Sequence, residues 1–508
     1  MNENPQRERP RKQPTGFKPT RRQVLAASGA TMAGLVAARL AGLKQLTPGV
    51  TLPGDSTATP TALPAPSAVG TQDWISPLGK PEAQVAHLLR RATFGATQQE
   101  YQAAVKDGFA KTVERLIETP AAEPPVLAGA DAANKDKPIS PVALQSWWID
   151  WMMKSPTPFA ERMTFFWHGH FTSDYRKVTP QTPYIYWQNR TWRKIALAKF
   201  RDMLYAVTTD PGMLRYLDLA QSTGKSPNEN YSRELMELFA MGVGTYTEDD
   251  VRAAAKGLAG WREPLTQALV DQAIKDAEAR GRPAPRNLKA DTVQVGIFEE
   301  RNAYLGQVKY LGETRQWDTN AVLDKIVAQD SVAPFIVDKV ASEFLSPSPD
   351  PAYVKRLADG FRKTKYDVKS LMRDVFTSPE FLASSSYRTL VKSPTELMVH
   401  AAKALGNTQL TQQMARAGDG MGQALFDPPE VGGWPSNASW ISTNNVLARV
   451  NFALTTLSAM PNVPAFKDAH VTHLDGVVSA ETAQLLNSAS DDATRWLILL
   501  ASPEFQLK

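Results

Sequence analysis

Apolar side chains recur at intervals of three and four residues along most of this 508-residue chain. In residues 81–92 the shared face would carry Val85, Leu88, Leu89 and Ala92. After Thr157-Pro158 the same spacing joins Phe159, Met163, Phe166 and Trp167. This period is typical of amphipathic helices, whereas the period-two alternation of strands is rare here. The pattern predicts an all-α protein.

Sequence signals for the start of a helix recur in the same region. Ser226-Pro227-Asn228-Glu229 and Ser393-Pro394-Thr395-Glu396 both have the order of a capping box with proline at the first helical position. We expect the first of these helices to run to Gly242. The sequence therefore predicts one large multi-helix globular domain over residues 73–508, with a sub-division near residue 310 as the alternative. Residues 266–290 are charged and rich in alanine, which is typical of a surface insertion.

The first 47 residues have the features of a twin-arginine (Tat) export signal. Thr20-Arg21-Arg22-Gln23-Val24-Leu25 precedes a mildly apolar run rich in alanine and glycine. Arg39 interrupts that run before it could span a bilayer comfortably, and we expect no membrane span in the mature chain. Residues 48–72, rich in Pro, Thr and Ala, are typical of a linker. The sequence thus predicts a periplasmic, cell-surface or extracellular protein that crosses the membrane folded, either cleaved or retained by its signal.

The charge distribution and the cysteine content exclude several classes of function. Residues 1–47 carry nine Lys/Arg against two Glu, a net charge of +7, whereas the whole chain is +5, so the remainder carries −2. The excess of basic over acidic residues therefore lies in the leader, and nothing in the remaining sequence suggests a nucleic-acid partner. The chain has no cysteine, which excludes disulfides, thiolate metal sites, iron–sulfur clusters and cysteine nucleophiles.

Several stretches between residues 82 and 508 resemble the bacterial family known as domain of unknown function 1800. The matching stretches are 87–95, 161–171, 228–238, 255–261, 392–397, 427–435 and 502–505. The resemblance implies an exported helical protein without an established activity, often encoded beside a sulfatase-like exported partner. The family usually has a His-Asp pair before its Leu-Gly, and here Ala303-Tyr304 precedes Leu311-Gly312 instead.

His168-Gly169-His170 is the first candidate for chemistry. Two imidazoles in one short segment could be metal ligands or a general base. On a continuous helix the two side chains would diverge, but a helix end at Gly169 would let them converge. The alternative is one core histidine hydrogen-bonded to backbone and one surface histidine.

A polar face on residues 229–237 is the second candidate. Asn230, Arg233, Glu234 and Glu237 would share one arc of a helix that begins at Pro227. Carboxylates three residues apart can bind a cation or share a proton. The alternative is a solvated face in which Arg and Glu pair with each other.

Aromatic density marks a third region. Residues 147–192 hold six of the twelve tryptophans. Tyr175 and Trp187 lie among polar residues in proline-broken sequence, which would suit a glycan or another flat ligand, with core packing as the alternative. The Gly/Pro-rich loop 427–440 could line a cleft.

No Walker A, GxGxxG, HExxH, GxSxG or EF-hand pattern occurs in the sequence. The leading hypothesis is an exported cation-assisted hydrolase of an envelope or extracellular polymer. In this hypothesis a divalent metal is held by, or acid and base catalysis is performed by, His168, His170, Glu234 and Glu237. Arg233 orients an anionic group. The ligand is bound by Asn230, Tyr175 and Trp187. The alternative is a non-enzymatic cell-surface scaffold or glycan-binding partner of another exported protein.

Overall fold

The computed structural model describes residues 75–127, 139–178, 183–283 and 294–508. The predicted export signal (1–47) and linker (48–72) lie outside these residues and stay predictions. Within the described chain no helix is both long enough and apolar enough to cross a membrane.

Helices make up almost all of the regular structure, as the apolar periodicity predicted. The α-helices of the first half are α2 (Pro81–Ala92), α3 (Gln98–Asp107), α4 (Phe109–Glu118), α5 (Pro141–Lys154), α6 (Pro158–His170), α7 (Tyr175–Val178), α8 (Tyr184–Ile195), α9 (Phe200–Thr208), α10 (Pro211–Tyr216), α11 (Asn230–Glu234), α12 (Glu248–Gly257) and α13 (Gln267–Ala279). Those of the second half are α14 (Thr319–Val327), α15 (Val332–Phe344), α16 (Pro351–Lys363), α17 (Val368–Thr377), α18 (Pro394–Ala404), α19 (Thr411–Gly420), α20 (Thr443–Ser458), α21 (Ala469–Leu474), α22 (Ala480–Ser488), α23 (Asp492–Ala501) and α24 (Pro503–Gln506).

The remaining elements are short. Strands β1 (Trp261–Arg262) and β2 (Ile297–Phe298) form one antiparallel pair, and β3 (Gln307–Tyr310) and β4 (Glu313–Gln316) form another. Single helical turns occur at η1 (Leu219–Gln221), η3 (Glu300–Asn302), η4 (Ser384–Ser386) and η5 (Asn437–Trp440), and η2 (Leu235–Ala240) is a π-helix. The described part of the chain is therefore all-α with two small hairpin-like sheets.

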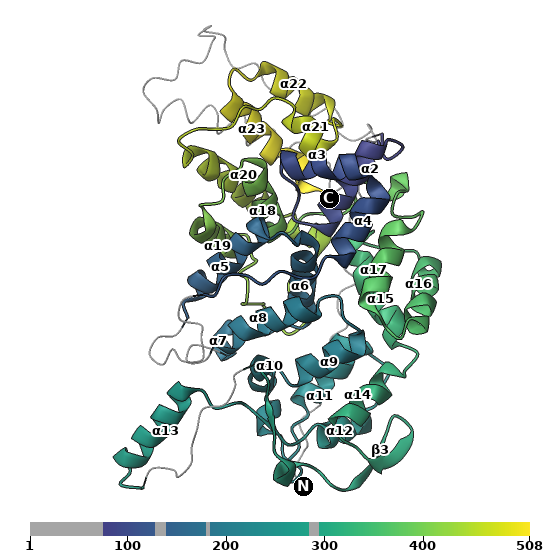
Figure 1. Ribbon diagram of the computed structural model, residues 1–508, viewed down its shortest axis with the longest axis vertical. Coiled ribbons are helices and arrows are strands. Elements are labelled where there is room, and N and C mark those ends of the chain that lie inside the picture. Colours follow the sequence, from purple (N-terminus) through teal and green to yellow (C-terminus); the bar gives the residue numbers. More distant parts are fainter. Residues whose placement is uncertain (1–74, 128–138, 179–182, 284–293) are drawn as a thin grey trace, which may run out of the picture.

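In Figure 1, α6 lies near the middle of an elongated body, and α13 projects from its lower end as the predicted surface insertion. One buried apolar cluster runs through this body, from Leu88 in α2 to Phe505 in α24. Because residues on both sides of position 310 join this cluster, the halves of the described chain share their core.

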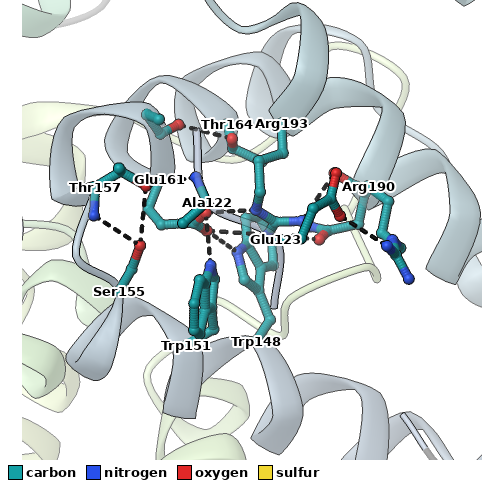
Figure 2. Close-up of polar contacts among 12 residues, drawn as sticks. Ala122, Glu123, Trp148, Trp151, Ser155, Thr157, Glu161, Thr164, Arg190 and Arg193 are labelled. Atoms are coloured by element: carbon teal, nitrogen blue, oxygen red, sulfur yellow. Dashed lines mark hydrogen bonds and ion pairs between the residues drawn. The ribbon is translucent and has the colours of Figure 1, made fainter. Parts of the chain in front are cut away.

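A buried ion pair fixes α6 against α5 and α8. The carboxylate of Glu161 accepts hydrogen bonds from the indole nitrogens of Trp148 (3.0 Å) and Trp151 (2.9 Å). Arg193 of α8 contacts both carboxylate oxygens, with Nη2 2.9 Å from Oε2 (Figure 2). Since Glu161 and Arg193 are almost fully buried, each charge depends on the other for compensation. Part of the tryptophan density therefore holds the three helices together.

The two predicted capping boxes have different outcomes. The box at the start of α18 is confirmed, since Ser393 and Glu396 exchange side-chain and backbone hydrogen bonds. The box at Ser226 is wrong. The Ser222 hydroxyl accepts from the Asn228 N–H (3.0 Å), and the Asn228 side chain accepts from the Asn230 N–H (2.9 Å). These bonds make a turn, and the helix begins only at Asn230.

Candidate functional site

A cavity of about 310 Å³ opens beside α6. Side chains of α6, α15, the first turn of α18, the 427–440 loop and the last residue, Lys508, line it. The loop was expected from the sequence to line a cleft, and it does so through Gly432, residues 434–437 and Trp440.

Helix geometry places the cavity residues of α6 and α15. Arg162, Phe166 and His170 are four residues apart, so they lie on one face of α6. The same spacing puts Lys339 and Glu343 on one face of α15. Each helix thus contributes an aligned row of side chains to the cavity.

The 427–440 loop is held against the end of α6 by close backbone contacts. Gly433 has a φ of +92°, and a Cβ added there would lie 2.4 Å from the carbonyl oxygen of Gly169. The Thr172 hydroxyl donates to the carbonyl of Val431 at 2.6 Å. Glycine is needed at 433 because a side chain would push the loop, and Trp434 with it, away from α6.

Four charged side chains form the floor of the cavity. Arg162 Nη2 and Lys508 Nζ each contact Oε1 of both Glu343 and Glu396, at 2.9 Å for Arg162–Glu396 and 2.8 Å for Lys508–Glu343. We call this set the floor cluster. Its two cations and two carboxylates balance in charge, which makes their burial tolerable.

The ion pairs of the floor cluster favour the charged forms of Glu396 and Arg162. Burial alone would raise the pKa of Glu396, but Lys508 and Arg162 outweigh burial and lower the pKa to about 2. Burial would likewise lower the pKa of Arg162, but Glu396 and Glu343 raise it. Nε and Nη1 of Arg162 have no hydrogen-bond partner among the described residues, and its guanidinium carbon lies 4.9 Å from the ring centre of Phe344. The stacked ring compensates part of this charge.

His170 lies in the cavity wall as a neutral imidazole. Its Nε2 is 2.9 Å from the carbonyl oxygen of Phe239, which can only accept, so Nε2 carries the proton. Burial lowers the pKa of His170 well below its ordinary value, and the charge of Lys339 adds to this effect. Nδ1 is therefore left with a free lone pair on a residue that lines the cavity.

His168 points elsewhere and is enclosed by aromatic rings. Its Nε2 accepts a hydrogen bond from the backbone N–H of Phe426 at 3.1 Å. The ring centres of Trp148, Phe426 and Trp434 lie 5.0–5.1 Å away. Burial lowers the pKa of His168 to about 3. Because α6 continues through Gly169 to His170, the two imidazoles diverge, and His168 is a core histidine hydrogen-bonded to backbone.

The polar residues of 229–237 pair with one another and with their neighbours. Arg233 holds both carboxylate oxygens of Glu248, at 2.7 and 2.8 Å. Glu237 accepts from the Tyr246 hydroxyl at 2.7 Å, and Asn230 is exposed. Burial raises the pKa of half-buried Glu234, and the charge of Glu237 adds to this. Glu237 lies in the π-helical turn that begins at Leu235, and the charges of Arg233 and Glu237 both act on Glu234, so these three predicted residues lie near one another.

The four predicted metal ligands are accordingly not gathered around one point. Neither Glu234 nor Glu237 lines the cavity that His170 lines. Among the residues that the structure describes, no group of three or more His, Asp or Glu side chains is arranged to hold a metal ion. Of the four predicted ligands, only His170 lines this cavity, and no residue of 229–237 does.

Tyr175 and Trp187, the predicted aromatic ligand contacts, lie outside the cavity. Tyr175 is buried and donates its hydroxyl proton to the carbonyl of Ile139. Trp187 packs on Tyr186, with the guanidinium of Arg190 5.1 Å from its ring centre. The aromatic residues that do line the cavity are Phe165, Phe166, Trp434 and Trp440.

The floor cluster was missed from the sequence, although a signal for it exists. Arg162 lies on the apolar stripe of α6, three residues after Phe159 and four before Phe166. A charge in such a position is buried and needs a partner. Glu396 was explained by its role in the capping box, and only one of its oxygens serves that role.

Comparison with known proteins agrees with the resemblance noted in the sequence. No curated protein and no solved structure matches this chain. A family model described as "Protein of unknown function (DUF1800)" matches residues 87–507, which include the cavity residues from Arg162 to Trp440. The chain belongs to the DUF1800 family of proteins of unknown function.

Proposed function

We propose that this protein is exported by the Tat route and binds a sugar unit of an envelope or extracellular polymer in the cavity, without cleaving it. The observation that carries the proposal is the combination of aromatic rings and hydrogen-bonding groups around one preformed hollow. Trp434 and Phe166 provide apolar faces, and Ser436, Asn437 and His170 provide donors and acceptors.

This combination suits a carbohydrate. Sugar rings present C–H faces that pack on aromatic side chains and hydroxyl groups that need hydrogen-bond partners at their edges. The volume of about 310 Å³ is at the lower end of the range for small-molecule sites, about 300–1,000 Å³. A cavity of this size suits a short saccharide segment as its ligand better than it suits the surface of a partner protein.

Binding explains the charges of the cavity better than hydrolysis does. Hydrolysis of a glycosidic bond calls for a carboxylic acid whose pKa is raised so that it can donate a proton. In contrast, the pKa of Glu396 is lowered to about 2, and Glu343 is held by the same two cations. The metal-assisted route loses support because its four ligands do not form a group that could hold a metal ion among the described residues. The glycan-binding alternative is therefore the one we favour.

The proposal also includes the export route of the protein and a partner protein. The twin arginines at 21–22 and the weakly apolar run that follows them favour delivery of the folded protein to the periplasm or the cell surface. An envelope or extracellular polymer would be accessible there. The family resemblance adds a sulfatase-like exported protein, encoded nearby, as a partner acting on the same polymer.

The test fills the cavity with a bulky side chain at a residue that lines it. Ser436 is exposed and lines the cavity, whereas Ser439 is exposed in the same loop and does not line it. We expect the purified full-length protein to bind members of an array of defined neutral and acidic bacterial oligosaccharides. Ser436→Trp should weaken that binding at least tenfold by calorimetry, and Ser439→Trp should leave it unchanged. Absence of binding to every saccharide, or equal binding by both variants, would reject the proposal.

A further inference from the structure

Lys339 differs from the other cations of the cavity because it lacks a carboxylate partner. Arg162 and Lys508 are both held in the floor cluster. For Lys339, no Asp or Glu oxygen among the described residues lies within ion-pair distance, and its ammonium group lies 5.0 Å from the ring centre of Phe335. A partly buried cation in such a setting keeps an unused capacity for an anion.

The surroundings of Lys339 leave that capacity open. Asp338 also lines the cavity, but adjacent residues of a helix do not face each other. Glu343, one turn further along α15, is neutralised by Arg162 and Lys508. His170 is neutral and lies near enough for Lys339 to lower its pKa. Burial lowers the pKa of Lys339 itself, and Asp338 opposes this effect.

We propose that Lys339 recognises an anionic group, so that the saccharide bound in the cavity is acidic and carries either a carboxylate or a sulfate ester. This inference rests on the proposed function and specifies its ligand class. A ligand anion would pair with the Lys339 ammonium group, and the free lone pair of His170 Nδ1 would accept a hydrogen bond from a sugar hydroxyl.

The energetics favour such a pairing over a surface contact. An exposed ion pair contributes little because water screens it, whereas a pair in a partly dehydrated cavity is stronger. Hydrogen bonds to charged groups contribute about 1.5–3 kcal/mol, which corresponds to roughly a ten- to hundredfold change in affinity. The floor cluster cannot supply this interaction, because its two cations already contact two carboxylates each.

The experiment compares matched oligosaccharides of one length in neutral, carboxylated and sulfated forms, using calorimetry on the full-length protein. We expect an acidic form to bind at least tenfold more tightly than the neutral one, and this preference should shrink in 0.5 M salt. The carboxylated and sulfated arms identify which anion is recognised. This comparison needs no variant, so it does not depend on a mutant that folds.

Substitutions then test whether Lys339 is the cation that recognises the ligand anion. Lys339→Met keeps the length of the side chain and should remove the preference for the acidic form, measured as the ratio of the acidic and neutral affinities of the same variant. Lys339→Arg should retain most of the preference. The control Lys355→Met removes an exposed lysine of α16, already paired with Asp359, and should have no effect.

The failures of the two proposals are distinguishable. Equal affinity for neutral and acidic forms, or a preference that survives in Lys339→Met, would overturn the role of Lys339 and leave the sugar cavity standing. If no saccharide binds in any form, both proposals fall.

Discussion

Nη2 of Arg162 lies 2.9 Å from Oε1 of Glu396, which joins the middle of α6 to the first turn of α18. Both side chains are buried, and Glu396 uses its other carboxylate oxygen to accept from the N–H of Ser393 at 2.8 Å. One carboxylate thus caps a helix and pairs with a cation of a distant helix. The cavity floor is therefore part of what holds the fold together, and its rigidity would preorganise a binding site.

Removal of Arg162 should be strongly destabilising. Arg162→Met leaves the buried carboxylate of Glu396 and the partly exposed carboxylate of Glu343 with Lys508 as their only cation in the floor cluster. We expect the free energy of unfolding to fall by about 3–5 kcal/mol, as found when one partner of a buried ion pair is removed. Urea unfolding followed by circular dichroism measures this change.

The control for this prediction is an exposed ion-pair cluster. Arg373 contacts Glu114 and Glu118 at the surface of α17 and α4. Arg373→Met should cost no more than about 1 kcal/mol, because surface pairs are screened by water. If the two variants lose equal stability, the floor cluster is not the structural element described here.

Acid should unfold the protein through its buried histidines. Five of the six histidines, His87, His168, His170, His400 and His473, are less than 10% exposed, and burial lowers the pKa of each. Their folded pKa values lie below the unfolded value of 6.5, so below pH 6.5 the unfolded state binds protons that the folded state does not. Their stabilisation is complete above pH 6.5 and is lost as the pH falls toward about 3.

The size of this effect depends on the folded and the unfolded pKa of each histidine. His168 and His473 have folded pKa values of about 3, so at pH 5 each contributes about 2 kcal/mol less than at neutral pH, and the two together account for roughly 4 kcal/mol. That is a large share of the whole stability of many proteins, about 5–15 kcal/mol, and His87, His170 and His400 act in the same direction. Guanidinium unfolding at pH 7.5, 6.5, 5.5 and 5.0 should show a steep fall across this range. A free energy of unfolding that is flat from pH 7.5 to 5.0 would contradict the prediction.

Gly433 and Gly432 provide a matched test of how the loop is held. At Gly433 an added Cβ would meet the backbone oxygen of Gly169 at 2.4 Å, and its φ of +92° is unfavourable for alanine. At Gly432 the nearest atom to an added Cβ belongs to the side chain of Glu430, at an ordinary 3.5 Å. Gly433→Ala should lower the melting temperature and weaken saccharide binding, because the loop and Trp434 must move. Gly432→Ala should leave the melting temperature unchanged within experimental error, and a reversed order of the two melting temperatures would argue against the observed loop position.

The sequence predicts the helices well because their signals are local. Apolar spacing in 81–92 gives α2 its observed bounds, Thr157-Pro158 marks the observed start of α6, and proline with a capping serine marks the start of α18. The failure at Ser226 has a local cause as well, since Ser222 and Asn228 form competing turn bonds. Side-chain to backbone bonds of this kind allow alternatives that a four-residue motif does not distinguish.

The site could be predicted only in part, because its residues meet through tertiary contacts. His170 and the 427–440 loop were singled out from the sequence, and the structure places both at the cavity. Arg162, Glu343 and Lys508 come from distant positions in the chain, and no local spacing links them. Glu234 and Glu237 lie close enough for their charges to interact, but their local spacing could not show that both lie outside the cavity that His170 lines.

Export by the Tat route is tested at the twin arginines. The Tat machinery reads the arginine pair itself, so a substitution that keeps the positive charge should still block it. We expect the double substitution Arg21→Lys, Arg22→Lys to retain the protein in the cytoplasm of a Tat-competent bacterium, as measured by cell fractionation and immunoblotting. The matched control, Arg9→Lys with Arg11→Lys, changes two arginines of the same leader and should leave export intact. Since Tat passengers cross folded, the destabilised Arg162→Met variant should also be exported less efficiently than Arg373→Met. Normal export of the Arg21→Lys, Arg22→Lys chain would mean that another route carries the protein, and the proposed location would then need separate support.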